Sequence, residues 1–301
     1  MSPARTSLRS AGIVSVLTLN LWHDAGPYAA RRALLREWIV KLDPDLIGFQ
    51  EALRGPTFDQ VDELLEGMAY HVDYAAASPF WRDPKHAPGT RNATELGNAV
   101  ASRWPIDQRD VLSLPDSGDG ETRVALSVTV TAPEPVGSLS FTCTHLNWKL
   151  HDSAVRERQV TAVCERVLAR RGASGFPPLL VGDFSAEPDS AEIRYVTGLQ
   201  SLGGRSVAML DAWRVAGRGG AGSGITWSNE NDYARLSLEP DRRIDYVFAG
   251  PPRRDGLGQI MHCRLVCDVE QDGVWPSDHF GVYAELRALP ISDLPPFDDA
   301  A

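Results

Sequence analysis

Short apolar runs alternate with helical patterns in the first part of the chain, and this alternation constrains the fold more than any other feature. Strand-like runs cover residues 13–19 and 46–49, and helical patterns cover residues 28–42 and 58–65. A helix that follows each strand can bury its apolar face against the sheet that the strands form. The sequence therefore predicts an α/β fold built in layers.

The rest of the chain adds further strands and one long helix. Strands are predicted at residues 99–102, 124–130, 139–144, 179–181, 244–248, 261–266 and 281–286. A helix is predicted between residues 152 and 171, because Val160, Val163, Cys164 and Val167 recur at the spacing of one helix face. We expect this amphipathic helix to pack on a sheet.

The sequence gives no sign of a division into two domains. No linker rich in Pro, Gly or Ser separates two halves, and no internal repeat is visible among the 301 residues. Single cores stop growing at about 250–300 residues, so length alone leaves the number of domains open. We expect one domain over residues 11–288, with flexible tails at residues 1–10 and 289–301.

The charge balance limits the partners that the chain can bind by bulk electrostatics. Thirty Lys and Arg oppose forty Asp and Glu, a formal net charge of −10, which argues against stable binding to nucleic acid or anionic lipid. Carboxylates that hold a divalent metal can still serve a phosphoester, because the ion supplies the positive charge. No apolar run reaches the eighteen residues of a membrane span, so no stable membrane insertion is expected.

The cysteines and two short motifs give little support to other chemistries. Four cysteines are too few for a disulfide scaffold and indicate buried thiols in a reducing cytoplasm. The glycines of residues 217–222 match G-x-G-x-x-G, but no strand precedes them and no helix follows. Cys164 and Arg170 have the spacing of a cysteine phosphatase motif, yet they lie inside the predicted long helix, where no phosphate-binding loop can form.

Polar residues gather at the ends of the predicted strands, where open sheets place their sites. Glu51 has two interpretations, a solvated acid at a strand end or an oxygen ligand for Mg²⁺ or Mn²⁺. Asp183 follows an apolar run and a glycine, so it either begins a turn or takes part in catalysis. His145 ends another apolar run, which suits a histidine near the core as well as a catalytic one.

Two further acids belong to the same pattern. Asp245 lies in an otherwise apolar strand, and a half-buried carboxylate needs a partner that offsets its desolvation, for which a histidine is suited. Asp278 and His279 precede the last strand, as a turn pair or as part of a site. Each of these positions is ordinary by itself, and their common place at strand ends is what suggests a site.

Taken in order, these segments resemble the endonuclease/exonuclease/phosphatase superfamily, on the side of its deoxyribonuclease-like and sphingomyelinase-like metal-dependent phosphoesterases. The resemblance runs from about residue 14 to residue 286. Its motifs are Leu-Asn20-Leu-Trp, Gln50-Glu51, Asn98-Ala-Val-Ala-Ser-Arg103, Thr144-His145-Leu, Gly182-Asp183-Phe-Ser185, Arg243-Ile-Asp245-Tyr and Ser277-Asp278-His279. Ordered motifs at strand ends are a specific signal, whereas any one of them is weak.

The resemblance implies both a fold and a reaction. The fold is a four-layer α/β sandwich, with two mixed sheets packed face to face and helices on the outer faces. The reaction is hydrolysis of a phosphoester, with a phosphodiester favoured, by activated water and Mg²⁺ or Mn²⁺. A phosphomonoesterase acting on a small soluble or lipid-derived phosphate is the alternative within the enzyme class.

The resemblance also implies roles for individual residues. Glu51 is similar to the principal metal ligand, with Asn20 beside it and Asp278 in support of a metal position. His279, oriented by Asp245, is similar to the general base that deprotonates the attacking water.

Two roles of the site remain open in this comparison. The Asp183 position is the alternative general base, and the sequence does not decide between it and His279. His145 is similar to a histidine that stabilises the phosphoryl oxygens or protonates the leaving group.

One position departs from the family pattern. Ser185 stands where most of the superfamily has an asparagine that donates its amide to the phosphoryl oxygen. A hydroxyl donates over a shorter reach, so a catalytically weak phosphoester-binding module is the competing hypothesis. Asn147 is a candidate for a substitute amide.

The substrate walls are the least defined part of the prediction. Trp227 precedes the Arg-Ile-Asp-Tyr motif and is a candidate wall of the substrate site, and Arg123 either steadies a phosphate or pairs with a carboxylate. A segment at residues 78–95, with Trp81, Arg82, His86 and Arg91, is a candidate substrate loop. We expect a monomer that binds a phosphoester substrate and contacts nucleic acid only transiently.

Overall fold

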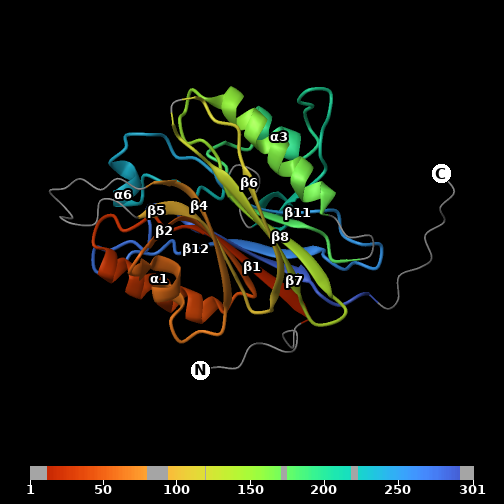
Figure 1. Cartoon of the computed structure of the whole chain (residues 1–301), viewed down its shortest axis with the longest axis horizontal. Coiled ribbons are helices and arrows are strands. Elements are labelled where there is room, and N and C mark those ends of the chain that lie inside the picture. The colour runs from red at the N-terminus through yellow and green to blue at the C-terminus, as the bar shows by residue number, and fades with distance from the viewer. Residues whose placement is uncertain (1–11, 80–93, 119, 171–174, 218–222, 292–301) are drawn as a thin grey trace.

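The computed structural model describes residues 12–79, 94–118, 120–170, 175–217 and 223–291 (Figure 1). The predicted N-terminal tail, most of the predicted C-terminal tail and the four named residues of the candidate substrate loop lie outside the described residues. The described chain forms two mixed β-sheets that pack face to face, with helices on the outside.

The first sheet has seven strands in the order β12-β13-β1-β2-β5-β4, with β3 paired to β2. Its strands are β1 (Ile13–Asn20), β2 (Leu46–Gly55), β3 (Phe58–Asp59), β4 (His71–Pro79), β5 (Glu95–Ser102), β12 (Ile260–Val266) and β13 (Gly281–Arg287). Strands β1 and β2 are parallel, and the other pairs of this sheet are antiparallel.

The second sheet has six strands in the order β10-β11-β9-β8-β7-β6. They are β6 (Ile106–Ser113), β7 (Val124–Thr131), β8 (Ser138–His145), β9 (Leu179–Asp183), β10 (Leu210–Asp211) and β11 (Asp245–Ala249). Here β8 and β9 are the parallel pair, and the others are antiparallel.

Helices cover the outer face of each sheet and complete four layers. The helices are α1 (Tyr28–Leu42), α2 (Gln60–Leu65), α3 (Ser153–Ala169), α4 (Ala191–Val196), α5 (Ala212–Ala216) and α6 (Asp232–Arg235). Apolar residues of α1 and α2 pack on the first sheet, and those of α3 and α4 pack on the second. Figure 1 shows α1 and α3 on opposite sides of the sheets. The predicted four-layer α/β sandwich is confirmed.

The main core fills the space between the sheets. Val16 of β1 belongs to the same buried cluster as Val128 of β7 and Phe141 of β8. At Gly48 of β2 the sheets approach so closely that an added Cβ would lie 2.5 Å from Cγ2 of Val181. Any larger residue at this position would therefore force Val181 or the sheets themselves to shift.

The structure corrects the sequence prediction at several elements. Strands β4, β6 and β10 were not predicted, and the predicted helix at residues 58–65 begins only at Gln60. Asp59 ends β3 and caps α2, since its Oδ1 accepts the backbone N–H groups of Val61 and Asp62 at 3.0 and 3.1 Å. This N-cap fixes the start of the helix. The predicted helix at residues 28–42 matches α1 in both bounds.

The strand directions bring the chemically important strand ends together. The parallel pairs β1·β2 and β8·β9 place Asn20 next to Gln50 and His145 next to Asp183. Strand β11 runs antiparallel to β9, so that Asp245 at its start lies opposite Asp183. Strand β13 runs antiparallel to β1, so the segment that precedes β13 lies at the C-terminal end of β1. One end of the sandwich therefore collects all of these residues.

Candidate active site

A cleft of about 530 Å³ opens at this end of the sandwich. It is lined by Trp22, His23, Glu51, His145, Trp148, Asp183, Ser185, Trp227, Glu239, Arg242, Ile244, Asp278 and His279. Predicted site residues from both sheets thus share one cavity. Asn20 and Asp245 are buried and hydrogen-bonded to lining residues.

Asp183 is the centre of the polar network. Its Oδ2 accepts a hydrogen bond from the amide of Asn20 at 3.1 Å and lies 3.3 Å from Nε2 of His145 and 3.8 Å from Nε2 of His279. Its Oδ1 accepts from the backbone N–H and the hydroxyl of Ser185, at 2.8 and 3.2 Å. Burial alone would raise the pKa of Asp183, but the two histidines and these hydrogen bonds lower it.

His279 and Asp245 form a buried pair beside Asp183. Nδ1 of His279 lies 2.9 Å from Oδ2 of Asp245, which fixes the orientation of the ring. Burial would lower the pKa of His279, but Asp245 and Asp278 outweigh it and raise the pKa to about 10. Burial raises the pKa of Asp245 in spite of the histidine. Trp227 packs edge-on against the ring of His279, with the two ring centroids 4.9 Å apart and an interplanar angle of 67°.

Glu51 reaches the cleft through an irregularity in β2. The register between β2 and β5 shifts between Phe49 and Ala52, and Glu51 has a φ of 54°, in the left-handed region. A β-bulge of this kind redirects a side chain that a regular strand would point elsewhere. The amide of Asn20 donates to Oε1 of Glu51 at 3.4 Å.

The donor set near Glu51 fits a divalent metal. The buried carboxyl of Asp278 has a pKa raised to about 7, first by burial and then by the negative charge of Glu51, while His279 and Arg31 oppose the rise. A cation bound by both side chains would offset this unfavourable charge on Asp278, and carboxylate oxygens suit hard divalent ions. In addition, Asp183, Asp245 and His279 offer ligand atoms within 4.8 Å of one another.

The pKa of His145 is low, and two residues that were candidates for contact with substrate, Arg123 and Asn147, lie outside the lining of the cleft. Burial and then the cation of Arg123 lower the pKa of His145 to about 4. Nε of Arg123 donates to Glu121 at 2.7 Å, and the amide of Asn147 donates to the same carboxylate at 3.3 Å. Neither Arg123 nor Asn147 is among the lining residues of the cleft, and Arg123 forms the carboxylate pair that was one of its two predicted roles. A contact of either side chain with substrate stays a prediction.

The structure adds lining residues that the sequence reasoning did not identify. They are Trp22, His23, Trp148, Glu239, Arg242 and Ile244. Trp22 follows Asn20 by two positions, Trp148 follows His145 by three, and Arg242 and Ile244 flank Arg243. Their place next to the motifs was the available signal, because loops that leave a strand end form the walls of the site there.

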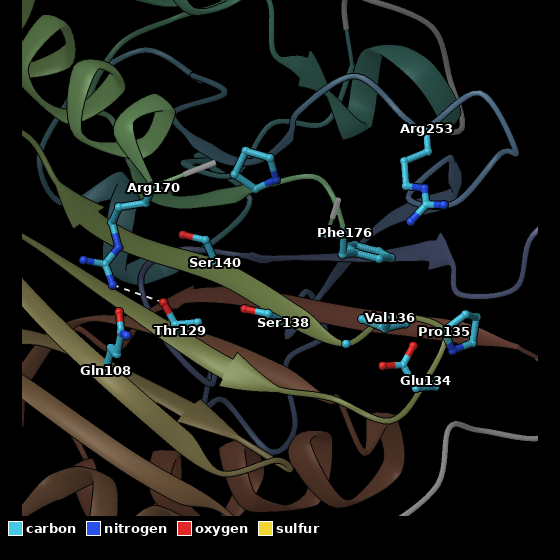
Figure 2. A pocket seen from close by; sticks show the side chains of 13 residues that line it. Gln108, Thr129, Glu134, Pro135, Val136, Ser138, Ser140, Arg170, Phe176 and Arg253 are labelled. Carbon is cyan, nitrogen blue, oxygen red and sulfur yellow. Dashed lines mark hydrogen bonds between the residues drawn. The ribbon is translucent and has the colours of Figure 1, made fainter. Parts of the chain in front are cut away.

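A second cavity of about 450 Å³ lies at the opposite end of β8. Figure 2 shows its lining, in which Arg170, at the end of α3, donates to the hydroxyl of Thr129 at 3.1 Å. Its described lining contains no histidine and no aspartate. Glu134 is the one acid of this described lining, so the cavity lacks the cluster of carboxylates and imidazoles that distinguishes the cleft at the other end.

Fold and cleft together define a class. A sandwich of two mixed sheets, with carboxylates and imidazoles gathered over the strand ends, is the architecture of metal-dependent phosphoester hydrolases. The chain belongs to the Endonuclease/Exonuclease/phosphatase family, whose sequence profile matches residues 17–279. The resemblance inferred from the motifs is confirmed, and the chain is an enzyme of the phosphoric ester hydrolase class.

Solved structures share the fold at low sequence identity. An endonuclease/exonuclease/phosphatase from Beutenbergia cavernae is 23% identical with a TM-score of 0.69, over 91% of this chain and 71% of that chain. D. rerio TDP2 complexed with single strand DNA product is 18% identical, with a TM-score of 0.68 over 91% and 98% of the two chains. The human Nocturnin catalytic domain with bound sulfate anion is 18% identical, with a TM-score of 0.67 over 91% and 93%. No curated protein matches by sequence.

Among the described residues, no helix combines the length and the apolar character that a membrane span requires.

Proposed function

We propose that the chain is a Mg²⁺- or Mn²⁺-dependent phosphodiesterase that hydrolyses its substrate with activated water in this cleft. The observation that carries the proposal is the placement of Asp183 between His145 and His279, at 3.3 and 3.8 Å, in a cavity that Glu51 and Asp278 also line. Charge neutralisation, water activation and contact with the phosphoryl oxygens each have a candidate side chain there.

The metal would be held by Glu51 and Asp278, with Asn20 orienting the first of these carboxylates. A bound divalent cation neutralises negative charge on the phosphoryl group and lowers the pKa of a water molecule. The unfavourable effect of the Glu51 charge on ionised Asp278 supports this assignment.

Two side chains can take the proton of the attacking water. Asp245 holds Nδ1 of His279, so Nε2 is the nitrogen that can accept a proton. Of the three carboxylates that raise the pKa of His279, those of Asp245, Asp278 and Asp183, Asp278 is the one assigned to metal, and its neutralisation brings this pKa down towards the working range. Asp183, with its lowered pKa, is a carboxylate at neutral pH and is the alternative base.

His145 suits the stabilisation of phosphoryl oxygens better than acid catalysis. With a pKa lowered to about 4, it stores no transferable proton at neutral pH. A neutral imidazole can still donate one hydrogen bond to an oxygen that gains charge in the transition state.

The lining charges favour a phosphodiester over a phosphomonoester. Four carboxylates line the cleft, those of Glu51, Asp183, Glu239 and Asp278, against the single arginine Arg242. A diester carries one negative charge, whereas a monoester carries about two near neutral pH and is repelled more strongly. The net charge of −10 favours transient rather than stable contact with nucleic acid.

The test is metal-dependent hydrolysis of bis(p-nitrophenyl) phosphate compared with p-nitrophenyl phosphate. We expect hydrolysis of the diester to need Mg²⁺ or Mn²⁺, to stop with chelator, and to fall at least about 100-fold in Asp183→Ala and His279→Ala. His71→Ala, an exposed histidine at the start of β4, is the matched control. Activity that survives both the chelator and the two cleft substitutions would refute the proposal.

Ser185 supports a second candidate function, a module that binds phosphoesters and turns them over weakly. Its hydroxyl is already hydrogen-bonded to Asp183, and its φ of 47° is one that asparagine adopts more readily than serine. Ser185→Asn is therefore compatible with the backbone. For an efficient enzyme we expect strong wild-type turnover, whereas for the binding module measurable hydrolysis should arise only in Ser185→Asn.

The proposed setting is a cytoplasmic monomer. All four cysteines are free and buried, which suits a reducing compartment. Light scattering coupled to size-exclusion chromatography checks the monomer, and fractionation of cells that express the full chain checks the location.

A further inference from the structure

Arg242 occupies a fixed place in the wall of the cleft. Its backbone pairs with that of Trp227 through two hydrogen bonds of 2.9 and 3.0 Å. Its guanidinium carbon lies 6.0 Å from the centroid of the Trp227 ring, and the same ring packs against His279. Trp227 thus separates a permanent positive charge from the reacting end of the cleft.

Arg242 is held in the cleft by an ion pair with Glu239, which an anionic group of a substrate can replace. Its side chain is 8% exposed, and Nη2 forms an ion pair with the carboxylate of Glu239, which is 23% exposed. The Nε atom of Arg242 is buried and has no hydrogen-bond partner among the described residues. Glu239 is the more exposed member of the pair, and an incoming anion that binds the guanidinium in its place leaves the buried cation paired.

The charges of the cleft give this arginine a distinct role. Among its described lining residues, Arg242 is the one arginine or lysine. Asp183 lies 3.8 Å from His279, and Asp278 lies next to His279 in the chain and close enough to Glu51 for their charges to interact, so the proposed metal would offset the charge of these acids. These three carboxylates do not require the charge of Arg242. The N–H groups of its guanidinium can therefore bind a phosphate or carboxylate of the substrate.

The surroundings of Arg242 limit the subsite to one anionic group. Glu239 pairs with the guanidinium, and Asp241 accepts hydrogen bonds from Asn229 at the adjacent rim. A long polyanion bound at Arg242 would bring further negative charges close to Glu239 and Asp241, which neighbour the arginine in the chain. A short substrate with a single further charge would avoid this repulsion.

We propose that Arg242 forms an anion subsite, and that the substrate is a small phosphodiester carrying one further phosphate or carboxylate group beside the scissile ester. This inference rests on the proposed function of the cleft. Glu239 pairs with the guanidinium when no substrate is bound, and the anionic group of the substrate replaces it on binding.

The experiment compares thymidine dinucleotides that differ only in a terminal phosphate. The probes are the unphosphorylated dinucleotide, its 5′-phosphorylated and 3′-phosphorylated forms, and a twelve-nucleotide single strand. We expect one phosphorylated form to have a kcat/KM about 10- to 100-fold above the unphosphorylated one, mainly through a lower KM, as a charged hydrogen-bonded contact provides.

The variants assign the preference to the ion pair. Arg242→Gln should bring the ratio of phosphorylated to unphosphorylated kcat/KM close to one, and Arg242→Lys should leave it intermediate. Glu239→Gln should increase the ratio, because it removes the competing carboxylate. Arg235→Gln is the matched control, since Arg235 is exposed and pairs with Asp232 in α6.

The outcomes separate this inference from the proposed function. A wild-type ratio near one, an unchanged ratio in Arg242→Gln, or an equal loss in Arg235→Gln overturns the anion subsite. A strong preference for the twelve-nucleotide strand overturns the limit to one further charge. If metal-dependent hydrolysis of bis(p-nitrophenyl) phosphate is itself absent, the proposed function fails, independently of Arg242.

Discussion

Asp183 shows how one side chain can organise a site at the scale of single residues. Its two oxygens face four neighbours, the side chains of Asn20, Ser185, His145 and His279. It is almost fully buried, so each of these contacts counts more than it would in water. Removing its charge changes the environment of both histidines at once.

Asp183→Asn keeps the shape of this side chain and removes its charge. We expect kcat for a phosphodiester to fall by about 10²- to 10⁴-fold, since the amide cannot accept a proton and no longer favours cationic histidines. The substituted side chain can still accept the N–H of Ser185, so the fold should persist. Steady-state kinetics with a melting curve measures both effects, and the exposed Asp189→Asn is the control. Loss of activity only in proportion to unfolded protein would contradict the prediction.

At this scale the strand-end residues were predictable and the walls were not. Glu51, Asp183 and His279 end or precede apolar runs, and strand ends of an α/β fold are where sites form. Arg242 and Glu239 belong to the connection between α6 and β11, whose path depends on tertiary contacts rather than on periodicity. Arg123 pairs with the carboxylate of Glu121, one of the two alternatives that the sequence left open, and the amide of Asn147 donates to the same carboxylate.

At the scale of elements, Arg31 connects α1 to the walls of the cleft. It is completely buried, and its guanidinium donates to five backbone carbonyls at 3.0–3.1 Å. These carbonyls belong to Leu21, Trp22, His23, Ala25 and Pro276. One helix side chain therefore fixes the loop after β1 and the segment that leads to Asp278.

Arg31→Lys should destabilise the protein although it conserves the charge. Lysine has a single ammonium group that cannot meet five carbonyls in this planar arrangement, so buried acceptors lose their partners. We expect a loss of about 3 kcal/mol in the free energy of unfolding, measured by urea denaturation. Arg32→Lys is the control, since the side chain of Arg32 is 39% exposed and pairs with Glu63, and it should change stability by less than about 0.5 kcal/mol. Equal effects of the two substitutions would argue against the bracing role.

Helices and strands whose apolar residues recur at a regular spacing were predicted from the sequence. Strands that lack an apolar run and depend on pairing with a neighbouring strand were not. Helix α1 matches its predicted range, and α3 lies inside its predicted one, because both have a continuous apolar face. Strand β6 was missed because most of its side chains are exposed at the edge of its sheet, so it has no apolar run. Strand β4 holds three consecutive alanines, which have low strand propensity.

At the scale of the whole molecule, the spacing of the two sheets depends on Gly48. An added Cβ would lie 2.5 Å from Cγ2 of Val181 and 3.2 Å from Sγ of Cys143, both in the second sheet. We expect Gly48→Ala to lower the free energy of unfolding by about 1–3 kcal/mol through overpacking. Urea denaturation of Gly48→Ala, Val181→Ala and the double variant tests the cause. If sheet spacing is responsible, Val181→Ala should recover part of the loss, and simple additivity would exclude this contact as its origin.

Metal binding should stabilise the whole sandwich, because the proposed ligands flank the first sheet and the cleft joins both sheets. A ligand that binds only the folded state adds about 2.7 kcal/mol at 100 times its Kd. We therefore expect the melting temperature to rise with added Mn²⁺ or Mg²⁺ and to return to its starting value with chelator. Differential scanning fluorimetry measures this shift without any need for a substrate.

Variants of the two carboxylates show whether they cause the shift. Burial and the charge of Glu51 raise the pKa of Asp278 to about 7, so at pH 8 the ionised Asp278 is unfavourable in the metal-free protein. Asp278→Asn should therefore raise the metal-free melting temperature at pH 8 and abolish the rise caused by metal. Glu51→Gln should act in the same direction, and the exposed Glu165→Gln on α3 should do neither. A metal-induced shift that persists in both cleft variants would place the ion elsewhere, with Asp183, Asp245 and His279 as the remaining cluster of ligand atoms.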